Sequence, residues 1–330
     1  MSDVRFLGSE ELTGLATPAE FVDAVREGYR ERGMGAPAEP RSRLDSEDPP
    51  GFLTGYTAIL PDAGAMGGYV YAAGFGSRDA QFVLPLFDAD SGEILAVLDG
   101  ASLNPYKTGA TGAVGVDALA RADASTVGLI GSGTQAKGQL LATAAVRDLT
   151  AVSVFSPTKE SREQFATGMS ESLDTAVEAV EDAESAVREA DIVITATTAS
   201  DPVFDSGWLS PGTHITAMGQ YHPEKREIDG ATVARSKYVP DLWGRLDQDA
   251  GAYIQAVNEG SIETDQAHAE LGEIIAGEAP GRESADEITV FDSGGTGIET
   301  VAAAKLLYDR AVEKGLGQSV SFSPASEAFL

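Results

Sequence analysis

A glycine-rich loop between an apolar strand and a helix is the feature that most restricts how this chain can fold. The segment TVGLI at 126–130 runs directly into the loop, and an Ala- and Leu-rich helical segment follows it. The loop has the spacing G-x-G-x-x-A and consists of Gly131, Ser132, Gly133, Thr134, Gln135 and Ala136. In this motif, two glycines allow a tight turn and a close approach of the backbone to a pyrophosphate, and the helix N-terminus supplies free N–H groups. We therefore predict that the loop binds a dinucleotide.

A Gly-rich loop could arise by chance in a chain with 37 glycines, so its context decides. From about residue 124, short apolar strands alternate with helical segments, including 134–146 and 181–189. The strand candidates besides 126–130 are 152–155, 191–197, 214–218 and 288–291. This alternation predicts a parallel sheet covered on both faces, the setting that the motif requires.

Outside this alternating region, the sequence predicts a different order of secondary structure. Thr17-Pro18-Ala19-Glu20 forms a capping box, and apolar residues at four-residue spacing predict a helix that Gly33 and Gly35 end. Residues 69–100 read as β-structure that closes with a hairpin turned by 88–92, whereas 36–68 shows only weak periodicity. We expect a final helix over about 298–314 and a loose tail over 321–330. A chain of 330 residues suits two domains, and the class is α/β.

Charge excludes several classes of function. The chain carries 52 Asp and Glu against 23 Lys and Arg, a formal charge of −29, so we expect neither a nucleic-acid nor a membrane partner. The acids are scattered and lysine is scarce, which favours adaptation to a salt-rich cytoplasm over an ordinary acidic enzyme or a polycation binder. There is no cysteine, and the N-terminus lacks a signal sequence. We expect a cytoplasmic protein.

The end of the second strand bears on the choice of cofactor. NAD sites place an acid there to bind the ribose 2′-hydroxyl. This chain instead has hydroxyls and cations, namely Ser156, Thr158, Lys159 and Arg162. These residues suit a 2′-phosphate, so NADP(H) is favoured, with NAD(H) as the alternative. The two cations could also be no more than a solvated helix start.

Several segments together resemble the ornithine cyclodeaminase and mu-crystallin family. They include SGEILAVLDG, LNPYKTGATGAVGVDALA, GLIGSGTQA, EADIVITATTASDPVF, LSPGTHITAMGQYHPEKREID and ITVFDSGGTGIETVAAAKLLYD, in the family's order. The resemblance implies a Rossmann NAD(P)-binding domain at 115–297. It also implies an α+β substrate-binding and dimerisation domain, formed by 1–114 with 298–330, that builds a homodimer.

The resemblance also implies three anchors for a substrate carboxylate. Arg41, after Glu39-Pro40, matches the first anchor, while Tyr69 stands where the family has Lys and Lys107 where it has Arg. Lysine offers a point charge with less angular control than the arginine fork. We favour an altered substrate over compositional bias as the reason. Tyr69 could orient the substrate through its hydroxyl or simply pack as a strand aromatic.

Gln220 stands where the cyclodeaminases have an Asp that handles the amine. Glutamine takes no proton, which argues against cyclodeamination. The resemblance implies further cofactor contacts from Thr108, Thr195, Ala196, Thr197, Thr198, Met218, Gly219, Ser293 and Gly294. Asp241 matches a family residue whose role the sequence does not define. His214, His222 and His268 lack metal-ligand spacing, so we predict no metal site, and only His222 is a candidate proton donor.

Together these features predict an NAD(P)-dependent oxidoreductase. It would transfer hydride at the nitrogen-bearing carbon of a small amino or imino acid, as alanine dehydrogenases and ketimine reductases do. Two alternatives stay open: an ornithine cyclodeaminase that uses NAD without net redox change, and a non-catalytic NADPH- or ligand-binding protein of the mu-crystallin type.

Overall fold

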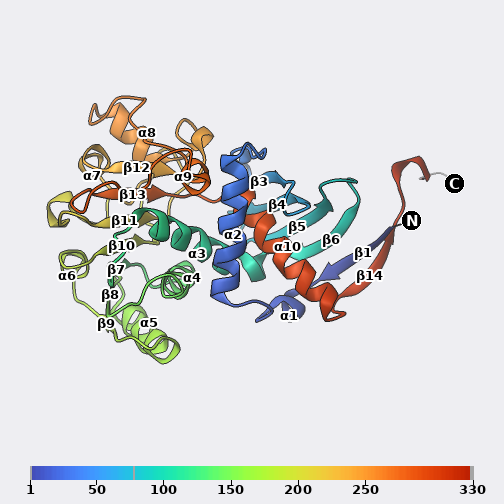
Figure 1. Ribbon diagram of the computed structural model, residues 1–330, viewed down its shortest axis with the longest axis horizontal. Helices are drawn as coiled ribbons and strands as arrows, with labels where there is room; N and C mark the ends of the chain where they lie inside the picture. The colour runs from blue at the N-terminus through green and yellow to red at the C-terminus, as the bar shows by residue number, and fades with distance from the viewer. Residues whose placement is uncertain (1, 77–78, 328–330) are drawn as a thin grey trace. The chain divides into compact units, whose positions relative to one another are not determined.

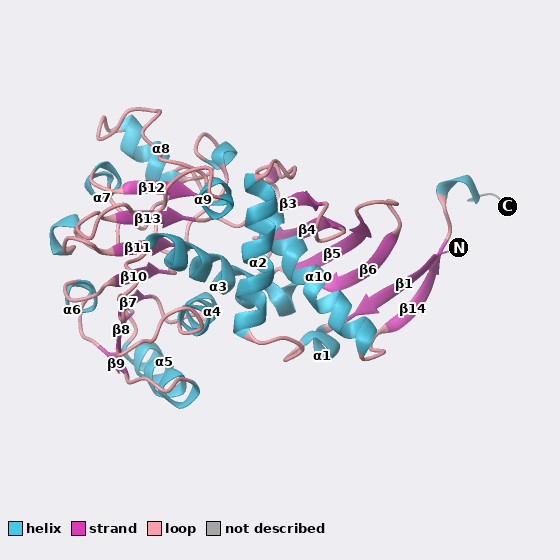
Figure 2. Cartoon of the chain, viewed as in Figure 1, coloured by secondary structure: helices cyan, strands magenta, loops and turns pink. Residues whose placement is uncertain are grey.

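The structure is a computed structural model that describes residues 2–76 and 79–327. The chain divides into two compact units. The first unit comprises 1–107 and 296–330, and the second comprises 108–295. Each unit is built around its own seven-stranded sheet, drawn in magenta in Figure 2. No helix in the described part of the chain is both long and apolar enough to cross a membrane.

The second unit is an α/β layer structure with a parallel sheet. Its strand order is β12-β13-β11-β10-β7-β8-β9. The strands are β7 (Thr126–Ile130), β8 (Ala151–Phe155), β9 (Val177–Ala179), β10 (Ile192–Thr195), β11 (His214–Ala217), β12 (Lys237–Pro240) and β13 (Thr289–Asp292). The helices are α4 (Thr134–Thr143), α5 (Lys159–Ser172), α6 (Ala183–Val187), α7 (Gly230–Ala234), α8 (Gly251–Asn258) and α9 (Leu271–Ala276). The predicted α/β class with a parallel sheet is confirmed.

The central strands of this sheet are buried on both faces, and β10 sends alternate side chains to two separate apolar clusters. In β10, Ile192 and Ile194 belong to one cluster, whereas Val193 belongs to the other. All four residues of β10, β11 and β13 are buried. Strands covered on both faces read as short continuous apolar runs, which is why the sequence pattern located them well.

The first unit combines a mixed sheet with two long helices. Its strand order is β14-β1-β6-β5-β4-β3-β2, and all neighbours are antiparallel except β1 and β6. The strands are β1 (Ser2–Leu7), β2 (Ser42–Glu47), β3 (Pro50–Leu60), β4 (Ala65–Ala73), β5 (Gln81–Asp88), β6 (Ile94–Asp99) and β14 (Gln318–Phe322). Helices α2 (Pro18–Gly33) and α10 (Gly297–Glu313) lie side by side, and α10 packs on β3 and β4 (Figure 1). The short α1 (Ser9–Leu12) precedes them, and α3 (Gly100–Leu119) continues into the second unit.

Helix α2 begins as its sequence predicts. Thr17 accepts a hydrogen bond from the backbone of Glu20, and the Glu20 carboxylate accepts one from Thr17 N at 2.8 Å.

The prediction of a loose tail over 321–330 is wrong for the first part of that segment. Ser321 and Phe322 belong to β14 and pair with β1, and 325–327 form a short 3-10 turn. All five residues of β14 are exposed, and the alternation of Val320 and Phe322 with serine is too short to distinguish the strand from a tail. Residues 328–330 of that tail lie outside the described residues.

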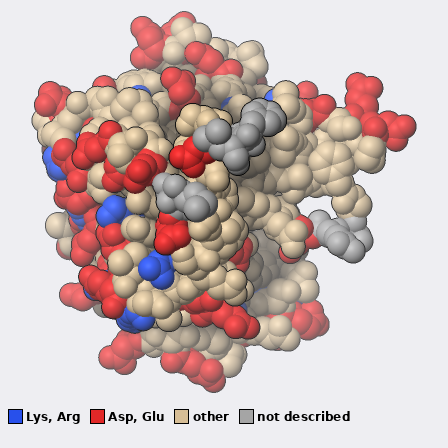
Figure 3. Space-filling view, turned by 90° about the vertical axis from the view of Figure 1, so that its right-hand side faces the viewer, with Lys and Arg blue, Asp and Glu red and all other residues tan. Residues whose placement is uncertain are grey.

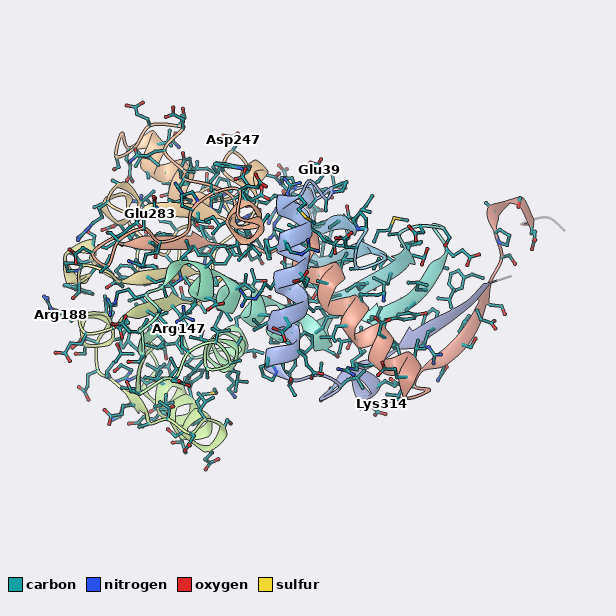
Figure 4. The ribbon with its side chains drawn as sticks, in the orientation of Figure 1. Glu39, Arg147, Arg188, Asp247, Glu283 and Lys314 are labelled. Carbon is teal, nitrogen blue, oxygen red and sulfur yellow. The ribbon has the colours of Figure 1, made fainter. Side chains whose placement is uncertain are left out.

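Among the charged side chains on the face drawn in Figure 3, the acidic ones predominate. Several surface cations pair with acids close to them in sequence. Arg188, labelled in Figure 4, follows α6 and points outward, and its guanidinium lies 2.5 Å from the Glu184 carboxylate. Such an exposed pair contributes little to stability, about 0–1 kcal/mol.

Candidate functional site

The glycine-rich loop joins β7 to α4 in the second unit. Gly131 has φ +118°, and a Cβ built there would lie 2.4 Å from the backbone oxygen of Ala196. Gly133 is the N-cap of α4 and is exposed, so nothing in the unit covers the helix N-terminus at that point. Gln135 carries a buried Oε1 that has no hydrogen-bond partner among the described residues. The loop therefore fits a dinucleotide pyrophosphate, because its glycines let the backbone approach closely and the N-terminus of α4 is open at Gly133.

The residues proposed to select the cofactor gather next to this loop but differ in accessibility. Ser132 Oγ donates to Ser156 Oγ at 2.9 Å, which ties the loop to the end of β8. Lys159 opens α5 with its side chain 61% exposed and 3.7 Å from the Glu163 carboxylate. Arg162 is buried instead, and its Nη1 donates to the Ser156 carbonyl at 3.0 Å. Lys159 is thus accessible to a ligand, whereas Arg162 supports the end of the strand.

A buried glutamate that the sequence reasoning missed organises the ends of β10 and β11. The Glu227 carboxylate accepts hydrogen bonds from Thr195 Oγ1 (2.9 Å), Thr197 N (2.7 Å) and Gly219 N (2.7 Å). Burial raises the pKa of Glu227, and the hydrogen bonds from Thr197, Gly219 and Thr195 oppose that rise. Gln220 joins the same group, since its side-chain Nε2 donates to the Thr197 carbonyl at 3.1 Å. Glu227 therefore holds together the strand-end residues predicted to contact the cofactor.

Three more residues predicted to contact the cofactor follow the same strands, and a fourth lies on a helix. Met218 N donates to the Thr195 carbonyl at 2.9 Å, and Ala196 N donates to the Ile130 carbonyl at 2.9 Å. Thr198 follows in the exposed loop after β10. Thr108 lies on α3, where its carbonyl accepts from Gln139 Nε2 at 2.7 Å. The structure thus places Ala196, Thr198 and Met218 at the ends of β10 and β11, and Thr108 beside α4 in the same unit.

Asp241 has a clear structural role that the sequence did not reveal. Its Oδ2 accepts hydrogen bonds from Ser293 Oγ (2.6 Å), Gly294 N (3.1 Å) and Gly295 N (3.2 Å). Its Oδ1 lies 2.7 Å from Nη1 of Arg245, which is fully buried. Asp241 therefore fixes the loop after β13, where Ser293 and Gly294 were predicted to contact the cofactor.

Arg245 is the centre of the charge network beneath that loop. Besides Asp241, its guanidinium pairs with Asp249 at 2.6 Å and with Asp292 at 3.2 Å. Desolvation acts against the charged guanidinium, but the three carboxylates prevail and raise its pKa well above the usual value. A Cβ at Gly294 would lie 2.4 Å from Arg245 Nη2, so only glycine fits there.

In the first unit, the three proposed anchors meet around one aromatic ring. Tyr56 lies on β3 directly opposite Tyr69 on β4, and their ring centroids are 5.5 Å apart. Arg41 Cζ and Lys107 Nζ each lie 5.2 Å from the centroid of the Tyr56 ring. All four side chains are buried. Arg41, Tyr69 and Lys107, which are far apart in sequence, therefore form one cluster, and Tyr56 is the member that sequence reasoning missed.

Lys107 has a buried counter-ion, which was also missed. Its Nζ lies 3.0 Å from Glu299 Oε1, and it donates to the Tyr56 hydroxyl at 3.3 Å. Burial lowers the pKa of Lys107, but the charge of Glu299 and the contact with Tyr56 outweigh burial and raise it. The lysine is therefore an ammonium, and its charge is balanced within the unit. No sequence spacing indicates this pair, because Glu299 comes from the distant α10.

Tyr69 acts as a packed strand aromatic. Its hydroxyl donates to the Gly100 carbonyl at 3.0 Å, and its ring also contacts Phe82 at a centroid distance of 5.1 Å. Burial raises the pKa of Tyr69 well above its usual value. Because a phenol has one proton, the hydroxyl of Tyr69 is committed to the backbone. Of the two roles considered for this residue, the structure supports packing.

The histidines are held by local contacts. His214 is fully buried between Thr289 Oγ1 (2.9 Å) and Thr216 Oγ1 (3.0 Å), and burial lowers its pKa to about 3. His268 Nε2 lies 2.8 Å from the Pro280 carbonyl. His222 Nδ1 accepts the backbone N–H of Glu224 at 3.2 Å.

A parallel sheet with a phosphate-binding loop after its first strand defines the class of nucleotide-binding α/β proteins to which the second unit belongs. The model of the ornithine cyclodeaminase/mu-crystallin family matches residues 18–315. The chain belongs to this family, and the predicted membership is confirmed.

The relatives carry names from amino- and imino-acid chemistry. A Delta(1)-pyrroline-2-carboxylate reductase from Bacillus cereus is 39% identical over 75% of this chain and 76% of its own length. The alanine dehydrogenase of Archaeoglobus fulgidus is 34% identical over 97% of this chain and 99% of its own. Among solved structures, Thermococcus litoralis Delta(1)-pyrroline-2-carboxylate reductase in complex with NADH and L-proline matches with a TM-score of 0.91. That match has 34% identity and covers 96% of this chain and 100% of the other.

Proposed function

We propose that this protein is an NAD(P)-dependent oxidoreductase that reduces a small cyclic imino acid at the carbon bearing nitrogen. The observation that carries the proposal is the convergence of Arg41 and Lys107 on the Tyr56 ring, each 5.2 Å from its centroid. Two buried cations next to one aromatic ring suit a planar substrate that bears a carboxylate. A bound nicotinamide cofactor would supply the hydride.

In this proposal, Arg41 binds the carboxylate through its planar fork and Lys107 adds a point charge. Tyr69 shapes the wall of the site through its ring, because its hydroxyl is already bonded to Gly100. Gln220 has no acid–base function and holds its loop through the Thr197 carbonyl. An amide at this position speaks against activation of an amine by a carboxylate there, and thus against cyclodeamination.

For the cofactor, we propose a preference for NADP(H), with Lys159 as the residue that binds the 2′-phosphate. The end of β8 offers hydroxyls of Ser156 and Thr158 in place of an acid, and Lys159 is the exposed cation beside them. Arg162 contributes indirectly in this proposal, by supporting the Ser156 carbonyl.

We also propose that the chain forms a homodimer through the exposed face of the first unit's sheet. Register places four exposed apolar side chains on that face: Leu44, Leu53, Val70 and Val83. The alternate residues of β4, Tyr69 and Tyr71, are buried. A contiguous apolar patch of this kind is typical of a protein interface. Val70→Lys should shift the protein to the monomer in light scattering, whereas Val312→Lys, on exposed α10 surface, should not.

The experiment for the activity is a 340 nm assay in molar KCl with NADPH or NADH. The substrates are Delta(1)-pyrroline-2-carboxylate, pyruvate with ammonia, and ornithine. Cofactor oxidation with the cyclic imine supports the proposal. Faster turnover of pyruvate with ammonia would favour an alanine dehydrogenase, which the Archaeoglobus relative makes the second candidate. Ammonia release from ornithine without a change at 340 nm would contradict the oxidoreductase and indicate a cyclodeaminase.

A further inference from the structure

The reduction of an imine needs a proton as well as a hydride, and the anchor cluster contains one hydroxyl placed to supply it. We propose that Tyr56 is the proton donor, and that Lys107 stabilises the phenolate that Tyr56 becomes. This inference rests on the proposed function, and it assigns a catalytic residue to that reaction.

The hydrogen bonding of the cluster singles out Tyr56. Tyr56 accepts a hydrogen bond from Lys107 Nζ at 3.3 Å, so its own proton points elsewhere. Among the described residues, the Tyr56 hydroxyl donates to none. The hydroxyl of the neighbouring Tyr69 already donates its hydrogen bond to the Gly100 carbonyl at 3.0 Å.

The surroundings of Tyr56 also suit the ionised form that remains after transfer. The Lys107 ammonium lies within hydrogen-bond distance of the hydroxyl oxygen, and Arg41 Cζ lies 5.2 Å from the ring centroid. In the proposed step, the ammonium would donate a charge-assisted hydrogen bond to the phenolate oxygen. Glu299, paired with Lys107 at 3.0 Å, keeps the ammonium in place when no substrate is bound.

The step balances as follows. Hydride adds to the imine carbon, the π pair of the C=N bond takes the proton from Tyr56 to form the new N–H bond, and the phenolate remains beside Lys107. A proton from solvent then restores the hydroxyl. The same residues run in reverse for oxidation of the amine, with the phenolate as base.

The test compares Tyr56→Phe with the wild type on two substrates of the same ring. One is the neutral cyclic imine, which needs a proton. The other is its N-methyl iminium, a permanent cation whose reduction needs none. We expect the variant to lose about 10²–10⁴-fold in kcat on the imine well above the pKa of the imine, the size usual for a lost general acid. It should lose less than about fivefold on the iminium, and the loss on the imine should shrink as the pH falls and the imine arrives already protonated.

Two controls separate this role from others. Tyr106→Phe removes a hydroxyl from a ring that stacks on Phe21 at 5.3 Å outside the cluster, and its activity should stay at the wild-type level. Binding of L-proline, followed by protein fluorescence without turnover, should change less than about threefold in Tyr56→Phe, because the carboxylate anchors remain. The melting temperature reports whether the variant folds.

Equal losses on both substrates would overturn the proposal and make Tyr56 a positioning residue. Full activity of Tyr56→Phe on the imine at high pH would also overturn it, as would a pH-dependent loss in His222→Asn that Tyr56→Phe lacks. If the wild type itself reduces no imine, the proposed function fails first, and this inference falls with it.

Discussion

Lys107 Nζ and Glu299 Oε1 lie 3.0 Å apart, and both side chains are only 1% exposed. The pair joins α3 to α10 within the first unit. In a buried ion pair, the attraction between the charges offsets the free energy that each loses on leaving water. Removing one partner therefore leaves an uncompensated buried charge, which destabilises the fold. The lysine that we propose as an anchor for the substrate is thus also part of the structure that holds its own site together.

This relationship predicts non-additive stability in a double-mutant cycle. Lys107→Met and Glu299→Gln should each lower the free energy of unfolding, Lys107→Met by about 3–5 kcal/mol because it strands the carboxylate. The double variant should lose less unfolding free energy than the two single variants lose together, by at least about 1 kcal/mol. Urea unfolding measures all three, and simple additivity would contradict the compensation.

Glu227→Gln tests the second buried carboxylate. The change replaces one of the acceptor oxygens with an NH2 group that faces donors from Thr195, Thr197 or Gly219. We expect a loss of about 1–3 kcal/mol in stability and weaker binding of the nicotinamide cofactor, by about tenfold. Fluorescence titration gives the Kd, and the exposed Glu224→Gln is the matched control. Unchanged cofactor affinity would remove Glu227 from its positioning role.

His214 predicts a specific dependence of stability on pH. Its pKa is about 3 in the folded protein against an ordinary 6.5. Below pH 6.5 the unfolded chain therefore binds a proton that the folded chain does not, so stability is full above pH 6.5 and falls as the pH drops toward 3. As the pH falls from 7 to 5, His214 should lower the free energy of unfolding by about 2 kcal/mol. His214→Gln should lack that loss in urea unfolding, and parallel profiles for the two proteins would contradict the assignment.

Lys159→Ala tests the proposed choice of cofactor. Loss of an accessible cation from a 2′-phosphate site should raise the Kd for NADPH about tenfold, or about 1.4 kcal/mol, and leave NADH unchanged. The control is Arg188→Ala, which breaks a comparable exposed pair four residues apart on another helix end. An equal effect on NADPH and NADH would refute a 2′-phosphate contact.

Most of the parallel sheet and the phosphate loop could be predicted from the sequence, because local patterns encode them. Short runs of apolar residues, beginning with TVGLI, indicate the buried strands. In the first unit, a capping box at Thr17 indicates the start of α2 in the same local way. β1, β2, β3 and β14 of the first unit went undetected, as did β9 and β12 of the parallel sheet. β2 is exposed along most of its length and its side chains show no strong period, and the period of β14 covers only Val320 and Phe322. The family and the class of activity were also predictable, since the motifs that carry them are contiguous.

The missed functional residues share a different property. Tyr56, Glu227, Arg245 and Glu299 gain their roles from partners that only the fold brings near: Glu299 meets Lys107 from 192 positions away. Burial of a charged group is the signal that would have identified three of them, and the sequence alone does not show burial. Tyr69 illustrates the converse, because a predicted anchor position proves to hold a ring whose hydroxyl is bound to the backbone.

The most direct test of the account compares two substrates that differ only in the carboxylate. Reduction of Delta(1)-pyrroline-2-carboxylate and of the unsubstituted pyrroline should be followed at 340 nm with the wild type and with Arg41→Ala. We expect the wild type to favour the carboxylate by at least about 100-fold in kcat/KM, equal to about 2.7 kcal/mol, and Arg41→Ala to lose most of that preference. Equal rates for the two substrates, or a preference that survives in Arg41→Ala, would contradict the proposed site.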